Sequence, residues 1–232
     1  MRKLLMSMLV AALAMPQVVF AQEQLGEIIV TAQRATGEYY SDGQPVIGLR
    51  RQADSAVQDI SINSDSRDEL TRKREIHAMI LSALDRAANA GVQLVTGNFE
   101  LVTVTKANYN DLEFKAGKRP DTSQIDLMVK AKLEGSTGTA QKRIDDFIRD
   151  VPATGRALID KNGELTLTII NPDQYRDQVL KLVAEGALHH AGFFGPDYGV
   201  EVSGLGEPLA WSQASNTEVF LYVPYRFIVK RK

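Results

Sequence analysis

The sequence predicts an α+β fold with a mainly antiparallel sheet and about three helices packed on one face of that sheet. Two observations predict it. After residue 53, several stretches alternate apolar and polar residues, as strands do when one sheet face is wet. Between them lie segments whose apolar residues recur at helical spacing, and such interspersed helices and strands favour a sheet covered on one side.

Length and composition set the class of protein. The chain has 232 residues, of which 44% are hydrophobic and 24% are charged, enough for one domain or two small ones with a real core. It contains no Cys, which excludes disulfides, iron–sulfur clusters, thiol catalysis and Cys-based zinc sites. The formal net charge is -2, whereas nucleic-acid-binding proteins are typically basic, so we expect no nucleic-acid partner.

Residues 1–21 have the pattern of a secretory signal peptide. Arg2 and Lys3 precede an apolar run, and small residues stand at the two recognition positions before Gln22. The apolar run is shorter than the ~20 residues that a membrane-spanning helix needs. We therefore expect the segment to be cleaved and the mature chain to have no transmembrane segment. The expected location is the periplasm, with association with the outer membrane left open.

Residues 22–48 predict a flexible leader, because four Gly and one Pro interrupt them and no apolar period is sustained. A short apolar segment within this leader closely resembles the TonB box of TonB-dependent outer-membrane receptors. Its residues are Glu27, Ile28, Ile29, Val30, Thr31 and Ala32. The resemblance implies that the segment adds a strand to TonB or to another envelope protein. A stray strand or a gene-fusion relic is the alternative, and the chain is too short to be such a receptor.

The first half of the body, which begins at residue 49, predicts a strand, a long helix and two more strand regions. The helix is expected from a capping box of Ser66 and Glu69 to about Ala90, with Gly91 as a left-handed C-cap. The expected strand regions are 57–63, 92–106 with an interruption at 97–98, and 125–133, and residues 108–120 are expected to form a loop.

The second half predicts two further helices and several strands. Helices are expected at about 139–151 and from Pro172 to about Gly192. Asn162-Gly163 between two apolar runs indicates a β-hairpin with strands 156–159 and 165–170. Three more strands are expected at 198–203, 209–213 and 218–230, the last broken at Pro224.

This body, residues 49–232, resembles the SIMPL domain of exported bacterial proteins. The residues that carry the resemblance are 51–57 (RQADSAV), Ala90-Gly91-Val92 at the end of the long helix, and 96–101 (TGNFEL). A Pro that often follows the last motif in the family is replaced here by 102–104 (VTV). The resemblance implies a periplasmic or surface-associated α+β protein with no established catalytic activity, and some family members form ring-like oligomers.

Few residues suggest chemistry. His189 and His190 are adjacent, so on a helix their side chains point about 100° apart and do not readily chelate one ion. His77 is remote from them, and no nucleophile elbow, dinucleotide fingerprint or P-loop is present. We therefore expect no catalytic, cofactor or metal site. Four aromatic residues have two possible roles: they fill the core, or they form an exposed patch that contacts a subunit or an apolar ligand. They are Phe193, Phe194, Tyr198 and Trp211.

Together these features predict a non-enzymatic protein of the cell envelope that acts by self-association or by binding a partner. A homo-oligomer is one expectation. An accessory of TonB-dependent transport that engages TonB through residues 27–32 is an alternative. A ligand-binding protein or hydrolase, whose pocket the sequence does not reveal, is another.

Overall fold

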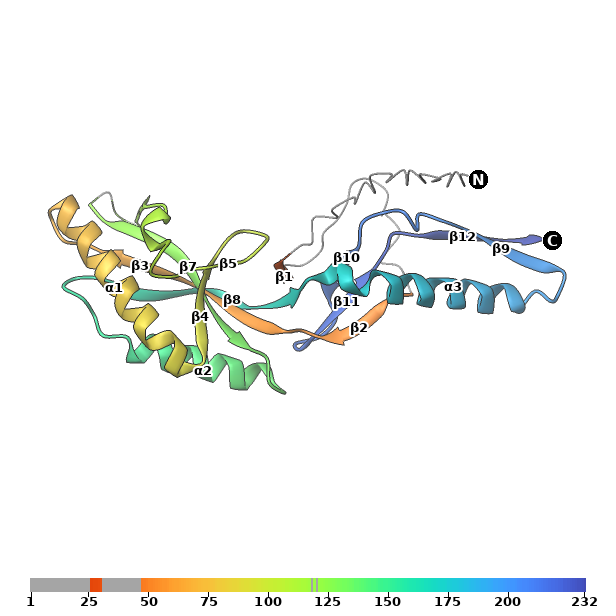
Figure 1. Cartoon of the computed structure of the whole chain (residues 1–232), viewed down its shortest axis with the longest axis horizontal. Coiled ribbons are helices and arrows are strands. Elements are labelled where there is room, and N and C mark those ends of the chain that lie inside the picture. Colours follow the sequence, from red (N-terminus) through yellow and green to blue (C-terminus); the bar gives the residue numbers. More distant parts are fainter. Residues whose placement is uncertain (1–25, 31–46, 118, 120) are drawn as a thin grey trace, which may run out of the picture.

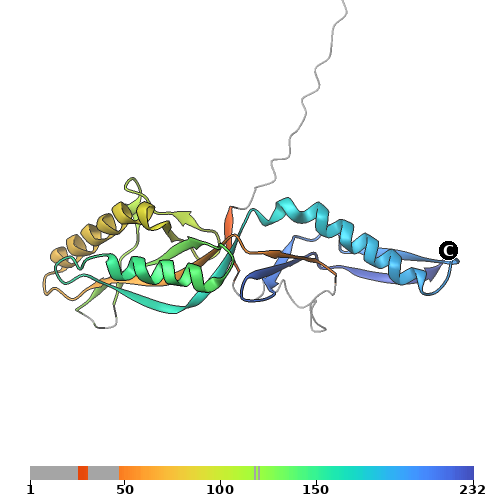
Figure 2. The same cartoon turned by 90° about the horizontal axis from the view of Figure 1, so that it is seen from below.

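The computed structural model describes residues 26–30, 47–117, 119 and 121–232 (Figure 1). The fold is α+β, and the paired strands run antiparallel throughout the described chain, as predicted. The molecule is elongated, with a sheet lobe at one end, a second lobe at the other and β1 (Glu27–Val30) at the junction (Figures 1 and 2). The predicted signal peptide lies outside the described residues. No helix within the described ranges is long and apolar enough to cross a membrane.

The sheet lobe is a seven-stranded sheet covered on one face by two helices (Figure 2). Its strand order is β1-β8-β3-β7-β4-β5, and β6 pairs with β7. The other strands are β3 (Ser55–Ser64), β4 (Val92–Thr96), β5 (Val102–Thr103), β6 (Lys115–Ala116), β7 (Ser123–Lys132) and β8 (Leu158–Ile170). The helices are α1 (Glu69–Ala90) and α2 (Thr137–Asp150), which contact each other and the central strands.

The second lobe contains two smaller sheets and the third helix. β2 (Leu49–Gln52), β10 (Ala210–Gln213) and β11 (Glu218–Tyr222) form a three-stranded sheet. β9 (Tyr198–Ser203) and β12 (Arg226–Arg231) form a two-stranded ribbon, and α3 (Arg176–Gly192) runs along it (Figure 2). The third helix therefore packs on this lobe, and only α1 and α2 cover the main sheet. Two 3₁₀ turns, η2 (Tyr109–Asp111) and η3 (Pro172–Tyr175), complete the structure described.

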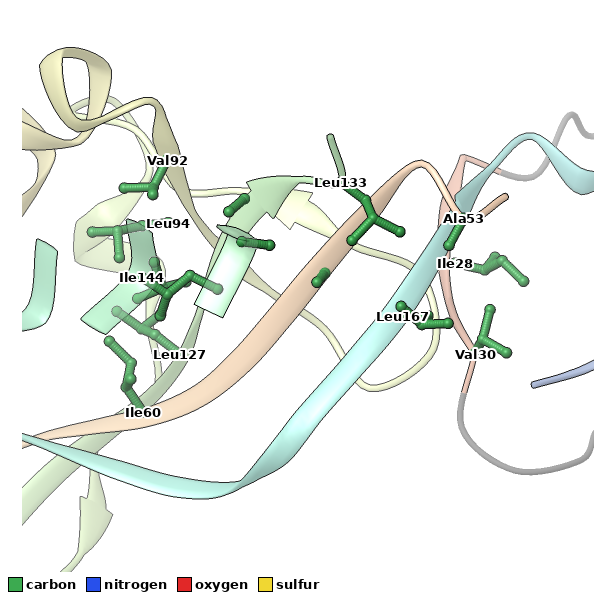
Figure 3. Close-up of a cluster of buried hydrophobic side chains, with 14 of the residues drawn as sticks. Ile28, Val30, Ala53, Ile60, Val92, Leu94, Leu127, Leu133, Ile144 and Leu167 are labelled. Atoms are coloured by element: carbon green, nitrogen blue, oxygen red, sulfur yellow. The ribbon is translucent and has the colours of Figure 1, made fainter. Parts of the chain in front are cut away.

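One hydrophobic core runs from the sheet lobe through the junction into the base of the second lobe. Ile60 of β3, Ile144 of α2 and Trp211 of β10 all belong to it. Figure 3 shows Ile28 and Val30 of β1 beside Leu167 of β8, so the N-terminal strand contributes to this core. A smaller buried cluster contains Ile29, Val57, Val95 and Met128. Since neighbours along a strand point to opposite faces, β1 joins both clusters and is packed on both sides.

The predicted long helix is confirmed, but its N-cap is not Ser66. The cap is Asp68, whose carboxylate accepts a 2.8 Å hydrogen bond from the Thr71 N–H. Ser66 instead donates through its hydroxyl to Glu75, at 2.8 Å. At the other end Gly91 has φ 67°, a left-handed conformation that Gly adopts without steric cost, as expected for this C-cap.

The predicted hairpin at Asn162-Gly163 is wrong. β8 runs through both residues as one strand of 13 residues and pairs with β3 along its length. The register shifts between Val57 and Asp59 of β3, so Asn162-Gly163 lies at a β-bulge. The Gln58 side-chain amide donates to the Asn162 carbonyl at 2.5 Å and stabilises this bulge. Gly163 has a φ of 62°. Both a β-bulge and a tight hairpin turn can require a positive φ, so this Gly fits either structure.

Candidate interaction surfaces

The segment that resembles a TonB box is a strand of the protein's own sheet as far as it is described. β1 pairs with β8 over Glu27–Val30. On its other side, the Ile29 N–H donates to the Phe99 carbonyl at 3.0 Å and the Leu101 N–H donates to the Glu27 carbonyl at 2.8 Å. Ile28, Ile29 and Val30 are buried. Within the predicted flexible leader, this stretch is therefore a packed strand. Thr31 and Ala32 lie outside the described residues.

Glu27 anchors β1 through a nearly buried ion pair. Its carboxylate accepts hydrogen bonds from Lys130 Nζ of β7 and Thr168 Oγ1 of β8, both at 2.5 Å. The Lys130 and Glu27 side chains are only 15% and 10% exposed. Because both edges of β1 are paired and its side chains are buried, a partner could pair with this segment only after β1 had left its own sheet.

The surface that remains open lies on the far part of the second lobe. We call it the arm and define it as residues 186–203 and 226–232, which comprise the end of α3, the following turn, β9 and β12. Five large apolar side chains are exposed along it: Leu188, Phe193, Phe194, Tyr198 and Ile228. By contrast, Trp211 is buried at the base of this lobe. The predicted aromatic group is therefore split, with Trp211 in the core and the other three members on the surface.

The arm also has open strand edges. β9 and β12 pair only with each other among the described strands, so each presents one unpaired edge. α3 packs against both strands of the ribbon. Alternation along β12 places Phe227 toward His190 of α3, their rings 5.5 Å apart, and places Ile228 on the opposite face. The arm thus combines two backbone edges with an uncovered face.

The three histidines lie in two separate places in the described chain. His77 packs against Tyr109 and Phe114, with ring centroids 5.3 and 5.1 Å away, and burial lowers its pKa below the usual 6.5. His189 and His190 contact Phe193 on the arm. Among the described residues, no group of three His, Asp or Glu side chains is placed to hold a metal ion.

A pocket of about 510 Å³ lies in the sheet lobe, beyond the end of β3. Asp65 in its wall accepts hydrogen bonds from Arg156 at 2.5 and 2.8 Å and from Arg119 at 3.0 Å. These bonds, those of Arg156 above all, lower the pKa of Asp65 to about 2. Each guanidinium is thus engaged by this carboxylate, which ties the loops before β7 and β8 to the end of β3.

Glu75 of α1 lies behind this ion-pair group. Burial raises its pKa, but hydrogen bonds from the Ser64 and Ser66 hydroxyls, at 2.6 and 2.8 Å, outweigh burial and lower the pKa overall. A carboxylate held ionised by two hydroxyls is poorly suited to take a proton from either of them. We therefore interpret these hydrogen bonds as holding the start of α1 against the end of β3, and not as activating Ser64 or Ser66 as a nucleophile.

Comparisons with protein families, with curated proteins and with solved structures found no match to this chain. The aromatic residues of the arm could be identified from the sequence, but exposed members could not be separated from buried ones, and the two open edges of the ribbon were not predicted.

Proposed function

We propose that this chain is a non-enzymatic, SIMPL-like protein of the cell envelope that acts by self-association through its arm. The observation that carries the proposal is the two-stranded ribbon β9–β12, in which each strand has one edge unpaired within the described chain and exposed apolar side chains lie around it. α3 packs on one face of this ribbon, and the other face and the two outer edges would gain stability if further strands or an apolar layer covered them. The signal-peptide pattern of residues 1–21 supports an exported location.

Charge favours one way of joining two copies. β12 carries Arg226, Lys230 and Arg231, whereas the only charged residue of β9 is Glu201. Pairing β12 with β12 of a second copy would place like charges side by side, which destabilises a strand pair. Within one copy, Glu201 already forms an ion pair with Lys230. Pairing β12 with β9 of the next copy would still avoid placing two basic strands side by side. Such a head-to-tail contact repeats, and it closes into a ring or extends as a filament.

Light scattering coupled to size-exclusion chromatography tests this proposal on the mature chain, residues 22–232. We expect a discrete multimer. Ile228→Asp places a charge on the uncovered face of β12, where the side chain is 66% exposed, and should shift the population toward monomer. Val102→Asp is the matched control, because Val102 is a strand residue of the sheet lobe and is 53% exposed.

The comparison of the two variants shows whether the chain self-associates through the arm or through another surface. The proposal requires that Ile228→Asp weakens the multimer and that Val102→Asp leaves it intact. A wild-type chain that stays monomeric at tens of micromolar would contradict self-association. Equal loss in both variants would contradict the assignment to the arm. Circular dichroism of both variants verifies that each one remains folded.

A further inference from the structure

The turn after α3 exposes two adjacent phenylalanines at one extreme of the molecule. Phe193 is 72% exposed and Phe194 is 61% exposed. The end of α3 and the C-terminal strand lie at the far end of the long axis, opposite the sheet lobe (Figure 2). Phe194 contacts Tyr198, with ring centroids 5.9 Å apart, so the aromatic surface continues from the turn into β9. The tip is a protrusion in which apolar side chains face outward.

One basic residue, Lys232, is tied directly to this tip. The Lys232 N–H donates to the Asp197 carbonyl at 2.8 Å, and Lys232 Nζ donates to the Pro196 carbonyl at 2.8 Å. The arm has four Lys and Arg residues against two acidic ones, excluding its two His. The whole chain has a formal charge of -2, so the positive arm contrasts with an otherwise acidic molecule.

We propose that this tip inserts Phe193 and Phe194 into the surface of an anionic phospholipid bilayer. Aromatic side chains partition into the boundary between headgroups and acyl chains, while Lys and Arg remain with the anionic headgroups. Apolar burial and charge attraction thus act at the same end of the molecule. One such contact is weak and reversible, and several tips in one assembly would add their affinities.

Shape and charge favour a bilayer over a second tip as the occupant. A protruding pair of rings needs a groove in a protein partner, whereas a bilayer accommodates it without a preformed complement. Beside the turn, Arg231 and Lys232 outnumber its one acidic residue, Asp197, so two tips facing each other would bring together surfaces with an excess of basic charge. The inference is independent of self-association through the strand edges, because it concerns the turn at residues 192–197.

Vesicle co-sedimentation of the mature chain tests the proposal. The probes are vesicles of phosphatidylcholine alone and vesicles in which about 30% of the lipid is anionic phosphatidylglycerol. We expect binding to the anionic vesicles and at least a tenfold weaker partition for Phe193→Ser with Phe194→Ser. The matched control is Leu70→Ser with Leu158→Ser, which removes two exposed apolar side chains from the sheet lobe and should bind as wild type.

Fluorescence reports insertion separately from adsorption. Trp211 is the sole Trp and is buried, so wild-type emission should not change with lipid. Phe194→Trp should show a blue shift with anionic vesicles, because its ring leaves water. Absence of binding to anionic vesicles would overturn the proposal. So would binding that both double variants retain, or bound Phe194→Trp protein whose emission does not shift.

The outcomes also separate this proposal from self-association. A monomer that binds anionic vesicles through the two Phe residues would contradict only the proposed multimer. A multimer that ignores lipid, or that dissociates when Phe193 and Phe194 are replaced, would assign the rings to a protein contact and overturn the membrane proposal.

Discussion

The two long helices of this protein bury side chains of different size, although each leaves one leucine largely in solvent, Leu70 in α1 and Leu188 in α3. α1 buries Ile76, Met79 and Ile80 against the main sheet. α3 buries only small or medium side chains, such as Val183 and Ala187, and leaves Leu188 in solvent. Exposed large apolar side chains occur in both lobes, but on the arm they lie around a ribbon of two strands, each with one edge unpaired among the described strands. We propose that the arm, with this ribbon and the exposed side chains around it, is the part of the chain that contacts another surface.

The largest expected effect compares one residue from each helix. Ile80→Ala should destabilise the protein by about 2–5 kcal/mol, because Ile80 is 0% exposed and its removal leaves a cavity. Leu188→Ala should change the unfolding free energy of the monomer by no more than about 0.5 kcal/mol, because Leu188 is 62% exposed. Urea unfolding at low protein concentration measures both values. Similar losses for the two variants would contradict the contrast between the helices.

The ion pair that anchors β1 should have the next largest effect. Lys130→Met leaves the Glu27 carboxylate nearly buried, with Thr168 as its one remaining side-chain partner among the described residues, and should cost about 1–3 kcal/mol. Adding Glu27→Gln removes the orphaned charge and should recover part of this loss. A double-mutant cycle in urea measures the coupling between the two positions. A coupling energy near zero would show that β1 is held by its apolar residues alone.

A single methyl group at Gly155 should also weaken the sheet lobe. A Cβ there would meet Glu75 Oε1 at 2.3 Å, and φ of 58° is left-handed. Gly155→Ala should cost about 1–3 kcal/mol, because it combines backbone strain with displacement of the Glu75 side chain. Gly206→Ala is the control, since a Cβ at Gly206 meets no atom within 4 Å and the residue has no left-handed φ. Thermal unfolding of the two variants separates strain from a general effect of Ala.

Most of the sheet lobe was predictable because its patterns are local. The apolar spacing of α1, the Gly91 cap and the alternation in β7 are each set by neighbours in sequence. Asn162-Gly163 was misread because a positive φ serves both a hairpin and a bulge. Only the pairing of β8 with β3, about 100 residues earlier in the chain, decides between them.

The candidate surface was less predictable for a related physical reason. An aromatic residue has the same local signature whether it fills a core or faces water, so Trp211 and Phe193 could not be separated by sequence. The strand at Glu27–Val30 gave a correct local signal, since β-branched residues favour extended backbone. The segments that pair with this strand could not be predicted, because β8 and Phe99–Leu101 are remote from it in sequence.

The smallest expected effect concerns His77 in the sheet lobe. Burial lowers its pKa, so the unfolded chain takes up a proton first as pH falls below about 6.5, and stability decreases there. Its Nε2 atom is buried without a hydrogen-bond partner. His77→Phe should therefore raise stability by up to about 1 kcal/mol at pH 7 and flatten the decrease in stability below about pH 6.5. Identical pH profiles for the two proteins would show that His77 does not titrate on unfolding.

Amide hydrogen exchange at two protein concentrations tests the central claim, that the arm is covered by a second copy. At about a hundredfold higher concentration, the amides of β9 and β12 should exchange more slowly because their outer edges become paired. The amides of β3, already paired on both sides, should exchange at an unchanged rate. Equal exchange of β9 and β12 at both concentrations, with a multimer present at the higher one, would contradict the account.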